Sequence, residues 1–286
     1  GPWRGPLLVA AALVGLVALF FNRLAFSNLI LARGDTFLYF YPYWHAAAAA
    51  LRAGRVPLWN PNIFMGAPFL ANSQAGFFYP LNWPVWLLLA TPYAVSASIL
   101  LHVTLAGVGT YLAGRRTLAL GRPAALFAAA LFALGGYLTA QVEHVNQLQA
   151  LAWLPWLFAA LGPLASGAAV GRRALVKTGL ALGVLFALQL LAGHSQSVFI
   201  SGVAVTLWLV ARFAWPSGPR EGRKSPALRG GVALAGGVAL AVALAAVQLL
   251  PTLELAGLSS RRGGLPLNEV LSFSRRCSAS TSPSCP

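Results

Sequence analysis

The chain has very few acidic residues and almost no cysteine. Of its 286 residues only five are Asp or Glu and two are Cys, and charged residues make up 9% of the sequence. Cys277 and Cys285 both lie in the last ten residues, which excludes a disulfide framework or a CxxC metal motif as the organising principle. A hydrophobic content of 58% excludes a soluble domain, because such a domain would expose large apolar areas. We therefore predict an all-α polytopic membrane protein, with the lipid bilayer as its first partner.

The apolar blocks predict a bundle of about seven transmembrane helices, since a spanning helix needs about 20 apolar residues. Arg4, in front of the first block, would suit a signal peptide, but no cleavage site followed by a soluble domain is found, so a retained span is favoured. Pro155 predicts a kink in the fourth block. The short piece 81–90 is predicted to be re-entrant or interfacial. The predicted spans are residues 7–21 with an apolar extension to 31, 93–112, 123–138, 148–165, 174–191, 198–210 and 231–250.

The positive charge of the chain predicts its orientation in the membrane. A net charge of +15 in a soluble protein would suggest nucleic acid, but here Arg and Lys lie between apolar blocks, so no nucleic-acid partner is expected. If successive loops lie on opposite sides of the membrane, 12 of the 20 basic residues fall on one side and 8 on the other. The side with more basic residues is predicted to be cytoplasmic. The outer side then holds four of the five acids and three of the four histidines: Asp35, Glu143, Glu254, Glu269, His45, His144 and His194.

The longest outer segment, about residues 31–80, is predicted to be a structured loop that contains an interfacial helix. Pro42, an alanine run and Gly54 favour a helix over 36–54, too short to cross the membrane, with an aromatic belt of Tyr39, Tyr41, Tyr43 and Trp44. Asp35 precedes this helix. The alternatives for Asp35 are a helix N-cap or an ion pair with Arg33.

The second half of the loop combines Pro, Asn and aromatic residues and should be ordered. Planar amides beside flat aromatic faces suit a sugar, so Asn60, Asn62 and Gln74 are candidate sugar contacts. The alternative is that these Asn side chains only cap their own loop.

The chain also resembles a known family. The segments GDTFLYFYPYW, PLWNPNIFMGAPFLANSQ with FFYPLN, HVNQLQALAWLPW, LAGHSQ, and QLLPTLEL followed by Ser260 and Arg261 occur in this order. Together they resemble the bacterial YfhO family of membrane proteins, which belongs with the GT-C glycosyltransferases. The resemblance implies a GT-C-like bundle in the cytoplasmic membrane, with an active site facing outward, that transfers a sugar from a polyprenyl-phosphate donor to a cell-envelope acceptor.

The resemblance also implies roles for individual residues. Asp35 matches the essential acid of the first outer loop and would act as general base or metal ligand, once partial burial raises its basicity. Positive charge would stabilise the departing lipid phosphate. A divalent ion between the outer acids and histidines is an alternative, although no HxH or HxxxH spacing supports a dedicated site and no metal ligand is assigned. The candidate substrate-binding residues are Arg33, His45, Arg52, Asn60, Asn62, Gln74, Glu143, His144, His194, Gln196 and Arg261.

Two alternative functions stay open: a transporter or flippase of lipid-linked saccharides, and a non-catalytic structural membrane subunit. Residues 1–270 are expected to form the membrane domain, corresponding to the amino-terminal part of a longer family member. Residues 271–286 read as a disordered or frame-shifted tail.

Overall fold

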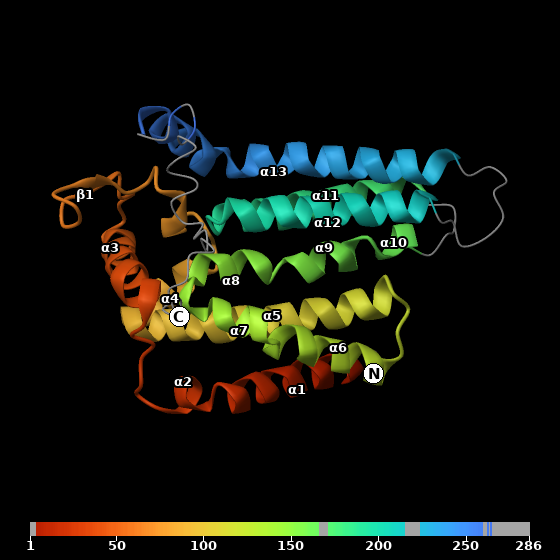
Figure 1. Cartoon of the computed structure of the whole chain (residues 1–286), viewed down its shortest axis with the longest axis horizontal. Helices are drawn as coiled ribbons and strands as arrows, with labels where there is room; N and C mark the ends of the chain where they lie inside the picture. The colour runs from red at the N-terminus through yellow and green to blue at the C-terminus, as the bar shows by residue number, and fades with distance from the viewer. Residues whose placement is uncertain (1–3, 166–170, 215–223, 260–261, 263, 265–286) are drawn as a thin grey trace, which may run out of the picture.

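A computed structural model describes residues 4–165, 171–214, 224–259, 262 and 264. The expected tail 271–286 and the candidate Arg261 lie outside these residues. The described chain is mainly helical, and most of its helices run alongside one another (Figure 1). Its membrane-length helices are α5 (Thr91–Arg116), α6 (Arg122–Leu134) continued by α7 (Gly136–Ala140), α11 (Arg172–Leu191), α12 (Ser195–Ala214) and α13 (Lys224–Leu258).

Five segments of the described chain are long and apolar enough to cross a membrane: Thr91–Arg116, Arg122–Glu143, Arg172–Leu191, Ser195–Arg212 and Arg229–Leu258. The prediction of an all-α membrane protein is confirmed at this level. The two other predicted spans do not form single helices of membrane length. The first block forms α1 (Arg4–Phe20), which is shorter than the five segments above, and then α2 (Asn22–Phe26). The helix does not continue to residue 31. The block 148–165 is broken into α8 (Val145–Leu151), α9 (Leu154–Ala160) and α10 (Gly162–Ala165), with Pro155 at the start of α9.

Glycine determines how closely α11 and α13 pack. Gly179 and Gly183 are one turn apart on α11, and a Cβ added to Gly183 would lie 2.7 Å from the Leu240 side chain of α13. A Cβ added to Gly237 of α13 would lie 3.0 Å from the Gly179 carbonyl oxygen. Association of helices in lipid relies on close packing rather than on the hydrophobic effect, so small residues at the contact let the two backbones approach.

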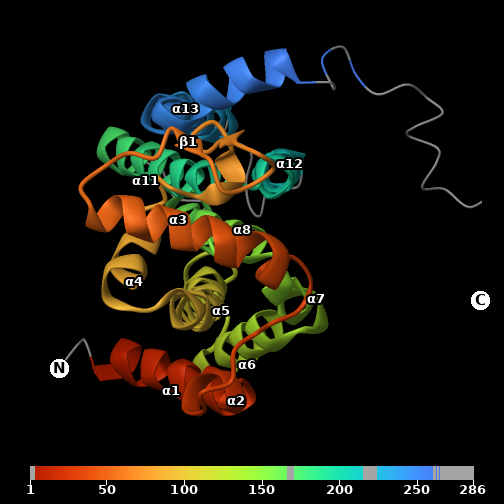
Figure 2. The same cartoon turned by 90° about the vertical axis from the view of Figure 1, so that its left-hand side faces the viewer.

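One end of the bundle carries the structured loop, and we call it the α3 end. Here η1 (Thr36–Phe40) leads into α3 (Tyr41–Arg52), which runs across the ends of the long helices (Figures 1 and 2). The antiparallel pair β1 (Trp59–Asn60) and β2 (Ala67–Pro68), the short turn η2 (Ser73–Ala75) and α4 (Asn82–Leu88) follow. The predicted helix in this loop is confirmed, whereas the expected aromatic belt is wrong for Tyr43 and Trp44, which are 5% and 1% exposed.

The loop is tied to helices that are remote in sequence. Gln248 of α13 donates from Nε2 to the Leu70 carbonyl (2.8 Å), and Thr252 donates to the Ala71 carbonyl (3.0 Å). Backbone carbonyls that would otherwise be unpaired are thereby satisfied, which is a condition for ordered non-helical structure at membrane depth.

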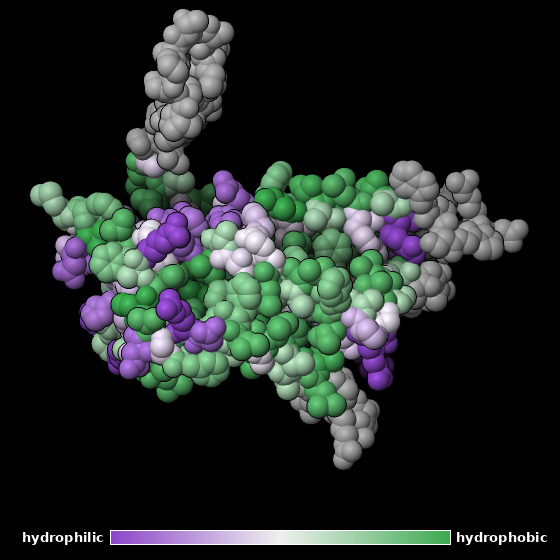
Figure 3. Space-filling view, turned by 60° about the horizontal axis from the view of Figure 1, so that its bottom comes forward, coloured by the Kyte–Doolittle hydropathy of each residue, from purple (hydrophilic) through white to green (hydrophobic). Residues whose placement is uncertain are grey.

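Charge and hydropathy separate along the bundle. The described acids Asp35, Glu143 and Glu254 all belong to elements at the α3 end (Figure 1). The middle of the molecule presents exposed apolar side chains, and hydrophilic residues gather towards the two ends (Figure 3). The helix termini at the opposite end carry only basic residues among the described charges: Arg115, Arg116, Arg122, Arg172, Arg173, Lys177, Arg212 and Arg229.

Candidate functional site

Three segments bring charged and imidazole side chains together at the α3 end. The first is the approach to η1 with Arg33 and Asp35. The second is the short turn η3 (Gln141–Glu143) together with His144, between α7 and α8. The third is the connection between α11 and α12, which contains His194. We call Arg33, Asp35, Glu143, His144 and His194 the charged cluster.

Two ion pairs cross between the first two segments. Arg33 Nε lies 2.9 Å from Glu143 Oε1, and His144 Nε2 lies 3.4 Å from Asp35 Oδ2. Both alternative interpretations of Asp35 therefore fail. Its side chain makes no capping hydrogen bond to η1, and Arg33 pairs with Glu143 instead. Asp35 is paired with a residue more than 100 positions away in the sequence.

These pairs contribute little to stability. The Arg33 and Glu143 side chains are 82% and 25% exposed, and those of His144 and Asp35 are 48% and 58% exposed. Exposed ion pairs typically contribute about 0.2–1 kcal/mol, so folding gains little from placing two of the five acids here. The burial expected for Asp35 is not observed. Both its carboxylate and the Arg33 guanidinium can reach solvent and a ligand.

His194 is held by the helix that follows it. Its Nδ1 accepts a hydrogen bond from the Ser197 backbone N–H (3.2 Å) and lies 2.7 Å from Ser197 Oγ. With Nδ1 used as an acceptor, these partners assign the proton of the neutral ring to Nε2, which remains a donor. Burial, and secondarily the nearby His144, lower the pKa of His194 below its usual 6.5. His194 is therefore a neutral hydrogen-bond donor near pH 7.

Close backbone contacts fix the positions of the three segments. Thr36, fully buried, donates from Oγ1 to the Glu143 carbonyl (3.1 Å). Gly34 adopts φ +51°, which favours glycine, and a Cβ there would lie 2.5 Å from Glu143 Oε2, so the Glu143 side chain would have to move. Asn146 Nδ2 lies 3.4 Å from the Gly193 carbonyl and links the second segment to the third.

A buried polar network lies beneath the loop and holds it on the bundle. Trp153 Nε1 donates to the Tyr79 hydroxyl (2.8 Å), which lies 2.7 Å from His102 Nε2. Gln149 Nε2 donates to Asn82 Oδ1 (2.6 Å) and Ser98 Oγ (3.0 Å). These partners come from the loop, α4, α5, α8 and the link between α8 and α9, and satisfied buried networks of this kind rigidify the elements they join.

The other predicted site residues lie at the α3 end without joining the charged cluster in a recorded contact. Arg52 donates to the Trp86 and Leu89 carbonyls (2.6 and 2.9 Å) at the end of α4. Asn60 is buried and accepts from the Asn62 backbone N–H (3.0 Å), which is the self-capping alternative. His45, Asn62, Gln74 and Gln196 are exposed. Their roles as substrate contacts stay predictions.

Several residues that shape the site were not singled out from the sequence: Thr36, Gly193, Ser197, Tyr79, Gln149 and Trp153. The spacing of His194 and Ser197 was the one local signal, because a residue three positions into a helix can pair with its cap. The other contacts join distant segments. Within the described residues no group of three or more His, Cys, Asp or Glu converges in a geometry that would hold a metal ion.

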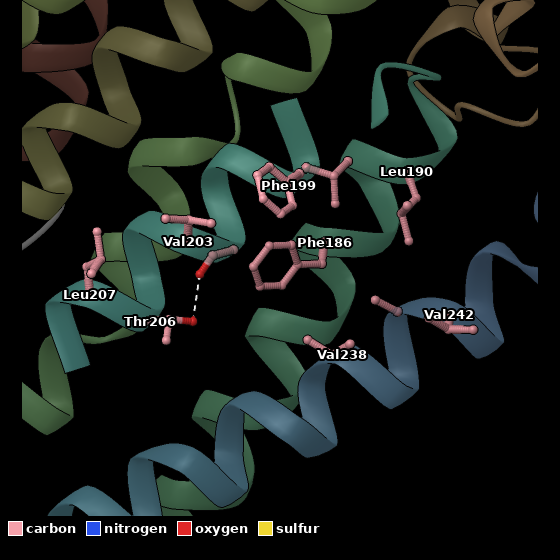
Figure 4. Close-up of a pocket in the computed structure, with 11 residues that line it drawn as sticks. Phe186, Leu190, Phe199, Val203, Thr206, Leu207, Val238 and Val242 are labelled. Atoms are coloured by element: carbon pink, nitrogen blue, oxygen red, sulfur yellow. Dashed lines mark hydrogen bonds between the residues drawn. The ribbon is translucent and has the colours of Figure 1, made fainter. Parts of the chain in front are cut away.

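One cavity of the described chain lies away from the charged cluster, between α11, α12 and α13. It is apolar and has a volume of about 460 Å³ (Figure 4). In the charged cluster, the side chains of Arg33, Asp35 and His144 are exposed to solvent. No family model, no curated protein and no solved structure matches this chain.

Proposed function

We propose that this protein transfers a sugar from a polyprenyl-phosphate donor to an acceptor hydroxyl at the outer face of the bacterial cytoplasmic membrane. The α3 end would face outward, and α1 and the broken segment α8–α10 would complete a seven-span, GT-C-like bundle. The observation that carries the proposal is the convergence of Asp35, Arg33 and two histidines from three segments at the α3 end. The orientation is supported by the basic helix termini at the opposite end.

Each member of the cluster has a chemical role in this reaction. Asp35 would accept the proton of the acceptor hydroxyl as its oxygen attacks the anomeric carbon of the sugar. The bond between that carbon and the phosphate oxygen then breaks, and the phosphate leaves with the bonding electron pair. Arg33 would bind the phosphate, with His194 donating from Nε2. His144 orients the Asp35 carboxylate.

The two ion pairs must open for a substrate to bind. Since Arg33, Asp35 and His144 are exposed, opening each pair would cost about 1 kcal/mol or less. Glu143 would release Arg33 to the phosphate, and His144 would release Asp35 to the acceptor. The pairs thus keep both groups in place without a large barrier to exchange.

The experiment is to incubate membranes that contain the protein with labelled polyprenyl-phosphate sugars and measure the release of polyprenyl phosphate. Asp35→Asn should lower the rate by about 10²–10⁴-fold, the usual contribution of a general base. Glu254→Gln is the matched control, because Glu254 is an exposed acid of α13 at the same end. Equal rates for wild type and Asp35→Asn would refute the assignment of Asp35.

A transporter of lipid-linked saccharides is the second candidate, favoured by the broken helix between α8 and α9. The polar residues next to this break, however, already have hydrogen-bond partners: Gln149 donates to Asn82, and Trp153 donates to Tyr79 of the loop. The same assay separates the two functions. A transporter would move the labelled donor across the membrane without releasing polyprenyl phosphate, and a structural subunit would do neither.

A further inference from the structure

Gln147 does not have the partner that its position in α8 predicts. His144 is the N-cap residue of α8, and Gln147 is the third residue of the helix. A Gln at this position commonly reaches back and bonds the backbone N–H of the N-cap residue, as in a capping box. Here the His144 N–H donates instead to the Gln141 carbonyl (3.0 Å). The Gln147 side-chain amide is therefore available for another partner.

That partner is the exposed Tyr137 of α7. Gln147 Nε2 donates to the Tyr137 hydroxyl oxygen (3.2 Å). Gly135, which is extended, separates α7 from α6, and Thr139 Oγ1 donates to its carbonyl (3.0 Å). The chain then passes from α7 through η3 directly into α8 (Figure 1). Tyr137 is 62% exposed and Gln147 is half-buried, so the pair is fixed in place but open to a ligand.

The pair of Gln147 and Tyr137 has hydrogen-bonding capacity that is not used. Among the described residues, no acceptor is recorded for the Tyr137 O–H and no donor for Gln147 Oε1. The reverse orientation of the amide would also leave one donor, Nε2, and one acceptor, the tyrosine oxygen. Two neighbouring hydroxyl groups of a sugar satisfy this combination, because each hydroxyl both donates and accepts. An alkyl chain does neither, and an ionised phosphate only accepts.

The position of the pair relative to Asp35 places it within reach of a sugar. The side chains of the N-cap residue and the third residue lie on the same side of a helix's first turn, about 5–6 Å apart at Cβ. Gln147 therefore adjoins His144, whose Nε2 lies 3.4 Å from Asp35 Oδ2. In the proposed reaction the anomeric carbon of the sugar lies next to the hydroxyl that Asp35 deprotonates. The other hydroxyl groups of that sugar would then extend over the neighbouring polar side chains.

We propose that Gln147 and Tyr137 bind two neighbouring hydroxyl groups of the transferred sugar and thereby determine which sugar the protein accepts. This inference rests on the proposed function, because the position of Asp35 places the sugar. Water can reach the exposed pair, so an unpaired group at this subsite is only partly desolvated. Discrimination should therefore be moderate, about tenfold for each missing hydroxyl, which corresponds to about 1.4 kcal/mol.

The test measures binding of a soluble donor analogue, geranyl phosphate esterified to C1 of glucose, and of its 2-deoxy, 3-deoxy and 4-deoxy forms. Glucose is used because each of these positions carries a hydroxyl that can be removed in turn. Titration calorimetry of the detergent-solubilised full chain gives the four dissociation constants. Wild type should bind the glucose analogue about tenfold more tightly than two deoxy analogues with neighbouring positions.

Gln147→Leu should bind the glucose analogue about tenfold more weakly than wild type does. It should bind the two affected deoxy analogues as wild type does, because the lost hydrogen bond is already absent from them. Tyr137→Phe removes only the hydroxyl and should lose discrimination at one of the two positions, which keeps the test open if Gln147→Leu does not fold. Tyr93→Phe is the matched control, because Tyr93 is another exposed tyrosine at the α3 end, at the start of α5. It should keep all four wild-type affinities.

Two results would overturn the inference. One is a wild type that binds all four analogues equally. The other is an equal weakening of all four in Gln147→Leu and Tyr137→Phe, which a purely structural or interfacial role would produce. Failure of the proposed function is distinguishable, because binding requires no turnover. If wild type discriminates as expected but releases no polyprenyl phosphate, the sugar subsite stands and the proposed transfer fails.

Discussion

Gly193→Ala should lower the free energy of unfolding for two separate reasons. Gly193 precedes His194 and has φ +84°, a conformation that costs a residue with a Cβ about 1–2 kcal/mol. The new Cβ would also lie 2.6 Å from the Ser73 carbonyl carbon and 2.9 Å from Gln74 Cα, so the backbone of η2 must shift. Overpacking of this kind costs about 1–3 kcal/mol. The expected total is a loss of about 2–5 kcal/mol of unfolding free energy.

Gly54→Ala is the control that separates the two costs. Gly54 follows α3 with φ +64°, and a Cβ there would meet no atom within 4 Å. It should lose only the conformational part, about 1–2 kcal/mol. Unfolding of both variants by sodium dodecyl sulfate in mixed micelles, followed by circular dichroism, measures the difference. Equal losses for Gly193→Ala and Gly54→Ala would show that η2 does not pack against Gly193, and the described assembly of the site would be wrong.

Three further predictions concern packing, pH and orientation. Gly237→Val should lower the unfolding free energy by about 1–3 kcal/mol more than Gly236→Val, because Gly237 faces α11 at 3.0 Å whereas Gly236 is open; equal losses would contradict the α11–α13 contact. The lowered pKa of His194 means that the unfolded chain binds its proton more readily, so its contribution to stability should fall as pH drops below about 6.5. His194→Asn keeps a side-chain acceptor at the helix N-cap but does not titrate. The unfolding free energy of this variant should therefore fall less than that of wild type between pH 7 and pH 5. Parallel curves of unfolding free energy against pH for the two proteins would contradict this. A cysteine at His45 should react with an impermeant maleimide from outside intact cells and one at Arg173 should not, in a background without Cys277 and Cys285; the reverse pattern would invert the orientation.

The sequence was sufficient to predict those features that depend on local pattern. Apolar blocks predicted helices near α5, α6, α11, α12 and α13, and Pro42 with Gly54 predicted α3. The order of basic and acidic loops placed Asp35, Glu143, His144 and His194 at one end. Periodicity and charge suffice here because the bilayer imposes a length on each apolar block.

Features that depend on tertiary packing could not be predicted. Pro155 predicted the break before α9, whereas the end of the first helical block at Phe26, short of residue 31, was not predicted. Tyr43 and Trp44 looked like interfacial residues, but the loop folds over them and buries them. The pairing of Asp35 with His144 was also out of reach, because Arg33 and the helix start were closer partners in sequence.

The most direct test of the account is the rate at which the purified protein releases polyprenyl phosphate from a labelled polyprenyl-phosphate sugar in the presence of an acceptor extract. Wild type and Glu254→Gln should release polyprenyl phosphate, and Asp35→Asn should release it about 10²-fold or more slowly. Release that is unchanged in Asp35→Asn, or that does not occur with wild type, would contradict it.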